Sequence, residues 1–293
     1  MKKVLALIMV AAMIACFAVV TSAAAPSDYI AYFSFDDAES GLTGGGAKAE
    51  IIGEGAKFEN GAITLDDNAT YLKVTKADGK PLLTGVETLT IAFKAYCYDL
   101  SAPSWPYYAI PDTLPSGTEQ QQWPREIYIG MLLKNDAALA ERYNNADIGA
   151  RPSAGSAPIP ANEWIHVAVV YDVDKTLIYI NGELLNETPN TEGYDQSLPA
   201  ILGQNSKYYI GLATWDAGEY FKGSLDDYVV YDYALTAEQI AALAADGVPA
   251  GDNGGDIGDN GGGGAPQTGF ATVALAVAAV ASGAYIVSKK RSK

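Results

Sequence analysis

The chain is poor in cysteine, histidine and basic residues. Its 293 residues include two cysteines and one histidine, with 19 Lys and Arg against 35 Asp and Glu, which gives a net charge of −16. So acidic a surface argues against binding to nucleic acid, because it would repel the phosphate backbone. Cys16 lies in an N-terminal segment that export would remove, which leaves Cys97 alone and excludes an intramolecular disulfide. The fold must therefore rest on its hydrophobic core.

The sequence also lacks the motifs of common hydrolases and nucleotide-binding enzymes. It has no Glu-x-Asp-x-Glu run, which would project carboxylates to one face of a sheet at the spacing that a retaining glycosidase requires. It has no Gly-x-Ser-x-Gly, His-Glu-x-x-His or Gly-x-x-x-x-Gly-Lys. We interpret His166 as structural, because a catalytic base needs a partner within hydrogen-bond reach. These absences argue against an enzyme.

The N-terminal residues 1–25 have the order of charged, apolar and small residues that is typical of a secretory signal peptide. Two lysines precede an apolar run over residues 4–20, and small residues fill positions 21–25. We expect cleavage after Ala23 or Ala24, and a retained N-terminal anchor is the alternative. Either way, the chain is expected to be exported.

The C-terminal end carries an apolar run, residues 270–287, followed by Lys289, Lys290 and Arg291. A helix of this length reaches about 27 Å, close to the ~30 Å hydrocarbon core of a bilayer. The basic tail favours a cytoplasmic end by the positive-inside rule, so the preceding residues would lie outside the cell. The Gly- and Asp-rich residues 247–264 cannot build a core and are expected to form a linker. The sequence therefore predicts one transmembrane helix behind a tether.

A pentapeptide directly before the apolar run contains Pro266, Gln267, Thr268 and Gly269. With the apolar run and the basic tail, it makes residues 265–293 resemble the cell-wall sorting signal of Gram-positive bacteria, which a sortase cleaves between Thr and Gly. The pentapeptide begins with Ala where the family usually has Leu. The resemblance implies a sortase as partner and attachment to the cell wall, and a plain membrane anchor is the alternative.

Between the two ends, residues 28–246 contain many short runs in which apolar and polar residues alternate. Examples are residues 29–35, 89–95, 164–171 and 177–180. Period two is typical of β-strands with one buried face. About twelve such strands with turns between them favour a two-sheet antiparallel sandwich.

Turn and cap residues support this interpretation. The segment WIHVAVVYDVDKTLIYINGELL reads as paired strands, with one turn at residues 172–175 and a second at Asn181-Gly182. Within the domain, one helix is expected at residues 237–245. Thr236 and Gln239 have the spacing of a capping box, and Gly247 follows the helix.

Two segments carry a family resemblance, EWIHVAVVYDVDKTLIYINGELL and YYIGLATWDAGEYFKGSLDDYVVYDYALTAEQIAAL. They resemble the concanavalin A-like, laminin G-like jelly-roll module, and YIAYFSFDD and GAITLDDNATYLKV are similar to its first strands. The resemblance covers residues 28 to about 245. It implies an all-β jelly-roll sandwich with a short C-terminal helix.

The resemblance also implies a metal site. In members of this family, residues equivalent to Asp36 and Asp226 can help to hold a structural Ca²⁺ ion together with backbone carbonyls. Calcium takes six to eight oxygen ligands, so two carboxylates and several carbonyls would suffice. The alternative is that Asp226 only bonds backbone amides or caps a turn.

Residues 100–125 are interpreted as an aromatic loop stiffened by prolines. Flat rings in such a loop can contact the apolar faces of sugars, while nearby polar side chains bind the hydroxyls. A second polar cluster, around residues 141–145, could line the same face. The alternative is that the rings pack the loop onto the sandwich. The residues assigned to the ligand site are Trp105, Tyr107, Tyr108, Trp123, Arg125, Arg142 and Asn144.

The sequence as a whole predicts a non-catalytic extracellular binding module, for carbohydrate, on the surface of a Gram-positive-type bacterium. The expected ligand is a glycan or a surface protein. A protein-binding or purely structural surface domain is the alternative, and a glycoside hydrolase is the reading that the missing motifs disfavour.

Overall fold

The computed structural model describes seven ranges of the chain, and the elements below lie within them. No helix in these ranges has the length and hydropathy needed to cross a bilayer. The segments expected to be the signal peptide, the linker, the sorting signal and the transmembrane helix lie outside them, apart from a few residues at their edges. The described ranges are 23–66, 69–98, 100–112, 127–134, 136–144, 154–213 and 219–251.

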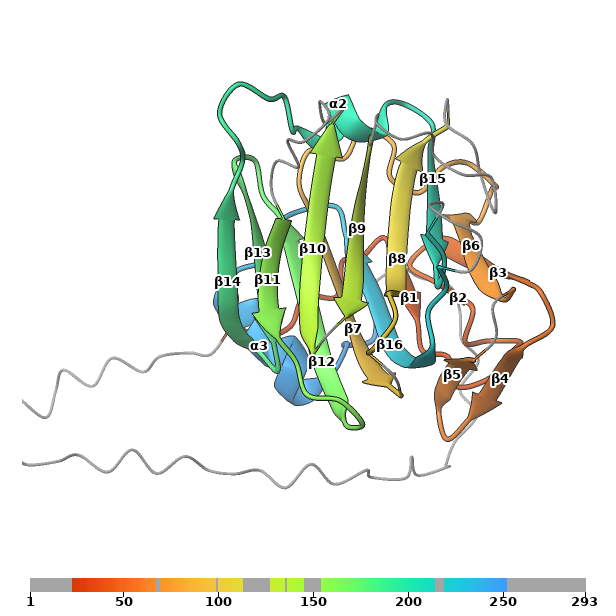
Figure 1. Cartoon of the computed structure of the whole chain (residues 1–293). Helices are drawn as coiled ribbons and strands as arrows, with labels where there is room; N and C mark the ends of the chain where they lie inside the picture. Colours follow the sequence, from red (N-terminus) through yellow and green to blue (C-terminus); the bar gives the residue numbers. More distant parts are fainter. Residues whose placement is uncertain are drawn as a thin grey trace, which may run out of the picture. The chain divides into compact units, whose positions relative to one another are not determined.

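Figure 1 shows two β-sheets that lie face to face, as the predicted all-β sandwich requires. All strand pairs among the described residues are antiparallel. In the first sheet, two short strands, β1 and β5, both pair with the same side of the long strand β16. Its strands, in spatial order, are β14 (Glu183–Pro189), β13 (Lys175–Ile180), β12 (Trp164–Tyr171), β7 (Leu89–Cys97), β16 (Gly223–Tyr231), β5 (Ala62–Leu65) and β4 (Ala56–Glu59), with β1 (Ala31–Phe33) beside β16.

The second sheet also has eight strands among the described residues. Its central strands β8, β9 and β10 are eight residues long, while β2 at its edge has only two. In spatial order it contains β11 (Ala154–Pro158), β10 (Ala137–Asn144), β9 (Ile127–Lys134), β8 (Ser104–Pro111), β15 (Ser206–Ile210), β6 (Tyr71–Lys76), β3 (Ala47–Ile52) and β2 (Thr43–Gly44).

The main hydrophobic core lies between the two sheets. It takes alternate residues from the strands of both, such as Ile91 and Phe93 of β7 and Ile129 and Met131 of β9, all fully buried. Strand alternation therefore gives each sheet an inner face toward this core and an outer face away from it. The two outer faces carry separate clusters of side chains.

Four tyrosines lie in the inter-sheet core, where a hydroxyl without a hydrogen-bond partner would be costly. The hydroxyls of Tyr107 and Tyr171 are 2.9 Å apart, and those of Tyr208 and Tyr228 bond to each other. Tyr171 also donates to the carbonyl of Gly130 at 3.1 Å. Burial is the largest cause of the raised pKa of all four phenols. The pairing lets the core hold these large polar rings.

Helix α3 (Ala237–Asp246) confirms the helix expected at residues 237–245, with both hydrogen bonds of the capping box formed. Ile240 and Leu243 of this helix pack on part of the outer face of the first sheet. The helix α2 (Leu198–Leu202) was not expected, because five residues are too few to show a helical period.

The strand expected at residues 29–35 is shorter in the structure. Strand β1 ends at Phe33, and Phe35 has φ 55°, a left-handed conformation that cannot continue a strand.

Candidate functional site

Three aromatic residues of the expected loop, Trp105, Tyr107 and Tyr108, lie in a strand. Residues Ser104–Pro111 form β8, so the loop prediction is wrong for this part of residues 100–125. Trp105 and Tyr108 lie in the cluster on the outer face of the second sheet, while Tyr107 points into the inter-sheet core. Their relative exposures are 2%, 0% and 0%. A buried ring presents no face to a ligand, so the structure favours the packing interpretation for these three residues.

The cluster around Trp105 and Tyr108 is a packed aromatic layer. The ring centroids of Tyr108 and Tyr128 are 4.8 Å apart, and those of Tyr128 and Tyr143 are 5.0 Å apart. Trp105 Nε1 donates to a carboxylate oxygen of Glu219 at 2.9 Å. The Tyr108–Tyr128 pair is tilted and the Tyr128–Tyr143 pair is edge-to-face, and both are favourable arrangements in a packed apolar layer.

A buried carboxylate serves the same layer. Glu141 is 4% exposed and accepts hydrogen bonds from the hydroxyls of Tyr128 at 2.7 Å and Tyr143 at 3.2 Å. Burial first, and the charge of Glu141 next, raise the pKa of Tyr128 well above its usual value. Glu141 is therefore held by two phenols.

The other polar residues assigned to the ligand site bind the backbone. Arg142 is fully buried, and its guanidinium donates to the carbonyls of Gln196 at 2.5 Å, Asp172 at 2.6 Å and Lys175 at 3.3 Å. Asn144 donates to the carbonyl of Asp195 at 2.5 Å. Both tie the end of β10 to nearby turns, and their assignment to a ligand face stays a prediction. The remaining two assigned residues, Trp123 and Arg125, lie outside the described residues.

Asp226 contacts a lysine. It lies in β16 with Oδ2 3.4 Å from Nζ of Lys94, and the same ammonium is 2.6 Å from Oδ2 of Asp227. Asp36 follows β1 and is exposed. Within the described ranges, no three or more His, Cys, Asp or Glu side chains gather where they could hold a metal ion. Calcium binding by Asp36 and Asp226 stays a prediction.

An accessible group of aromatic rings lies on the outer face of the first sheet, where the sequence interpretation placed no site. Trp164 of β12 is the cross-strand partner of Tyr96 in β7, and their ring centroids are 5.8 Å apart. Tyr98 follows β7, with its ring 5.3 Å from that of Tyr96. Trp164 and Tyr96 are half-buried, whereas Tyr98 is 46% exposed. We call these three residues the aromatic platform.

A chain of hydroxyls runs beside the platform. Ser224 of β16 is the cross-strand partner of both Tyr96 and Thr64. Its Oγ is 2.8 Å from the hydroxyl of Tyr98 and 2.8 Å from Oγ1 of Thr64. In both contacts either oxygen can be the donor. These three hydroxyls can therefore reverse the direction of their hydrogen bonds when another hydroxyl approaches.

A charged row lies next to the platform, two residues further along the same strands. His166, Lys94 and Asp226 are cross-strand neighbours in β12, β7 and β16. Burial, followed by the charge of Asp227, raises the pKa of Asp226 to about 6. Burial lowers the pKa of Lys94, but the carboxylates of Asp227 and Asp226 together raise it more. Lys94 thus stays a cation between two carboxylates.

His166 is neutral in this row. Burial, followed by the charge of Lys94, lowers its pKa to about 4. Its ring is partly accessible, but Nδ1 is buried and has no hydrogen-bond partner among the described residues.

The sequence contains only a weak signal for the aromatic platform. Tyr96 and Tyr98 are two residues apart, as are Trp164 and His166, so each pair projects to one side of its strand. Only the register of β12 against β7 brings the two pairs together, and that register comes from the fold.

A family model described as the concanavalin A-like lectin/glucanases superfamily matches residues 66–241, more than half of the chain. No curated protein sequence matches the chain.

Several solved structures share the fold. Domain 4 of AbnA, a GH43 extracellular arabinanase from Geobacillus stearothermophilus in complex with arabinotriose, has TM-score 0.51 and 17% identity over 74% of this chain and 98% of that domain. The binding domain of botulinum neurotoxin DC has TM-score 0.51 in its complex with SialylT and 0.50 in its complex with rat synaptotagmin II. Both show 12% identity over 75% of this chain and 51% of theirs, so the chain spans about half of that domain. The match over residues 66–241 shows that the chain belongs to the concanavalin A-like lectin/glucanase superfamily.

Proposed function

We propose that this chain is a non-catalytic carbohydrate-binding module and that the aromatic platform binds the glycan. The observation that carries the proposal is the set of three neighbouring rings at Tyr96, Tyr98 and Trp164, accessible on one sheet face beside a chain of hydroxyls. Aromatic faces stack on the C–H faces of sugar rings, and hydroxyls nearby bond the sugar hydroxyls. The platform offers both kinds of contact.

The charged row widens the set of groups that a glycan could contact. The side chains of Lys94 and Asp226 are 29% and 23% exposed, so both reach solvent beside the rings. A sugar hydroxyl can accept from an ammonium and donate to a carboxylate, and such charge-assisted hydrogen bonds are the stronger ones. The row would orient a ligand that the rings hold.

The similar structures support this class of ligand. The GH43 domain was solved with arabinotriose and the neurotoxin domain with SialylT, and both share the fold of this chain.

We also propose that the module is displayed on the outer surface of a Gram-positive-type bacterium. The signal-like residues 1–25, the Gly- and Asp-rich tether and the tail with Pro266, Gln267, Thr268 and Gly269 support this proposal. Sortase processing predicts a mature chain that ends at Thr268, whereas a membrane anchor predicts that residues 269–293 remain. Mass spectrometry of the C-terminal peptide from the native cell envelope distinguishes the two.

A protein ligand is the second candidate. Leu184 and Leu185 of β14 are 46% and 43% exposed, and β14 is the edge strand of the first sheet. Exposed apolar side chains on a sheet edge are a typical contact for a partner chain. The neurotoxin domain of the same fold was also solved with synaptotagmin II.

A glycan array with matched variants tests the proposal. We expect the wild-type chain to bind a subset of glycans and Tyr98→Ala or Trp164→Ala to weaken that binding about tenfold each, which is the contribution of one stacked ring. Leu184→Ala and Leu185→Ala are the controls, because they remove exposed apolar side chains from the same sheet away from the platform. Unchanged binding in a Tyr98→Ala, Trp164→Ala double variant would reject the platform. A folded wild-type chain that binds no glycan would reject the function in favour of a protein ligand.

A further inference from the structure

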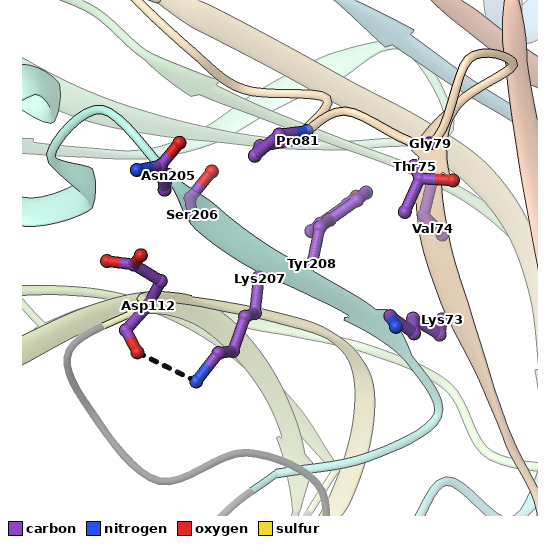
Figure 2. Close-up of a pocket in the computed structure, with 10 residues that line it drawn as sticks. All are labelled: Lys73, Val74, Thr75, Gly79, Pro81, Asp112, Asn205, Ser206, Lys207 and Tyr208. Carbon is purple, nitrogen blue, oxygen red and sulfur yellow. Dashed lines mark hydrogen bonds between the residues drawn. The ribbon is translucent and has the colours of Figure 1, made fainter.

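A hollow of about 260 Å³ lies between β6 and β15, at the end where the two strands separate (Figure 2). The strands pair only from Tyr208 with Val74 to Ile210 with Leu72. Ser206, at the start of β15, pairs with β8 on its other side and with no residue of β6. The hollow is therefore a product of the sheet register.

The turn after β6 forms one wall of the hollow. Lys76 N donates to the carbonyl of Lys80 at 2.8 Å, and Gly79 N donates to the carbonyl of Lys76 at 2.9 Å. Gly79 has φ +86°, a conformation that glycine adopts without strain. Hydrogen-bonded backbone thus fixes the position of Pro81 at the top of the hollow in Figure 2.

The lining combines apolar surface with a few polar groups. Val74, Pro81 and Tyr208 supply apolar atoms, and the polar side chains belong to Lys73, Thr75, Asp112, Asn205, Ser206 and Lys207. This mixture is typical of small-molecule sites, and the volume is just below the roughly 300–1,000 Å³ of sites for drug-sized ligands. The hollow suits one sugar ring better than an oligosaccharide.

Ser206 carries a polar group without a partner in this wall. The residue is 5% exposed, and its Oγ is buried and makes no hydrogen bond in the part of the chain that the structure describes. An unpaired buried hydroxyl destabilises the fold, so a group that fills the hollow and bonds this oxygen would recover that lost energy.

The charges of the hollow stand at two separate places. Figure 2 shows Lys73 on one side and Asp112 on the other, with Lys207 between them. The ammonium of Lys207 donates to the carbonyl of Asp112 at 2.9 Å. Lys73 forms no ion pair among the described residues, although the chain is strongly acidic. A ligand with an acid group at one end and hydroxyls at the other would match both sides.

We propose that this hollow binds one carboxylate-bearing sugar residue. Lys73 would contact the carboxylate, while Ser206, Asn205 and Asp112 would bond the hydroxyls and Pro81 would cover the apolar face of the ring. The site shares no residue with the aromatic platform, so it adds a second and chemically distinct subsite to the proposed glycan-binding function.

The test is an NMR titration of the full chain with sodium glucuronate, with glucose and sodium acetate as reference ligands. We expect glucuronate to bind more tightly than either, because only glucuronate combines the carboxylate with the hydroxyls. Lys73→Gln should raise its dissociation constant about tenfold, since it removes a charge-assisted contact, and Ser206→Ala should raise it several-fold. Lys48→Gln, an exposed lysine on β3, should leave it unchanged.

The outcomes separate this site from the platform. Equal binding of glucose and glucuronate, no binding of glucuronate, or a Lys73→Gln variant that binds like wild type would each overturn the proposal. Tyr98→Ala should not alter glucuronate binding. If the array shows no glycan bound to the platform while glucuronate still binds through Lys73, the proposed platform fails and the hollow stands.

Discussion

At the scale of single residues, Arg142 is the clearest case of a side chain that holds the fold together. Its buried guanidinium bonds three backbone carbonyls, and the buried carbonyl of Gln196 would lose this donor if the side chain were removed. We expect Arg142→Met to lower the free energy of unfolding by about 3 kcal/mol. Urea denaturation measures this, with Lys48→Met as the exposed control. A loss of less than 1 kcal/mol would mean that water replaces these bonds.

The raised pKa of Asp226 predicts that its contribution to folding stability falls as the pH rises, which is the opposite of the behaviour of most acidic side chains. Its pKa is raised from 3.8 to about 6 in the folded chain, so folding binds its proton more tightly and stability falls as the pH rises through this window. Asp226→Asn should therefore stabilise the protein at pH 7 by on the order of 2 kcal/mol and change little at pH 4. Denaturation at both pH values tests this, with Asp174→Asn as the exposed control. Equal stability of wild type and variant at pH 7 would show that Lys94 fully compensates the charge.

His166 predicts a second pH effect in the same row. Its pKa is lowered from 6.5 to about 4, so the stability that depends on the neutral ring is present above pH 6.5 and is lost as the pH falls toward 4. His166→Gln should lose less stability than wild type over that range. A thermal-unfolding series from pH 7 to pH 4 measures the difference, and parallel curves would exclude a buried neutral histidine.

At the scale of elements, α3 covers part of the outer face of the first sheet. Thr236 accepts from Gln239 N at 3.3 Å, and the Gln239 side chain accepts from Thr236 N at 2.9 Å. Loss of the cap in Thr236→Ala should cost about 1 kcal/mol. Thr191→Ala, at an exposed threonine outside any helix, is the control in the same denaturation series. An unchanged free energy of unfolding would indicate that packing alone holds the helix.

Elements with a clean period could be predicted from the sequence, and β8 could not. The segments WIHVAVVY and TLIYI alternate and form strands, and the capping box marks α3. In β8, however, aromatic residues occupy both faces and Pro106 interrupts the alternation of apolar and polar residues. The sequence therefore predicted a loop for this segment. The structure places Pro106 at a register shift between Ser104 and Tyr107, where a strand tolerates proline.

At the scale of the whole molecule, the sequence predicted the sandwich but not the accessible part of its surface. Tyr107 and Tyr108 occupy the inner and outer faces of one strand and are both fully buried. Tyr98 is accessible because it follows its strand, beyond the area that α3 covers. Composition identifies aromatic residues, whereas tertiary packing decides which of them a ligand can reach. The aromatic platform could therefore be located only once the strand register was known.

The most direct test of the platform is to locate a bound glycan on the molecule. A crystal structure of the domain with a glycan selected on the array should show the sugar rings across Tyr96, Tyr98 and Trp164, with hydroxyls within hydrogen-bond distance of the Ser224 side or the Lys94 side. A glycan bound instead over Trp105 and Tyr108 on the second sheet would contradict the assignment, because those rings would then have to become accessible.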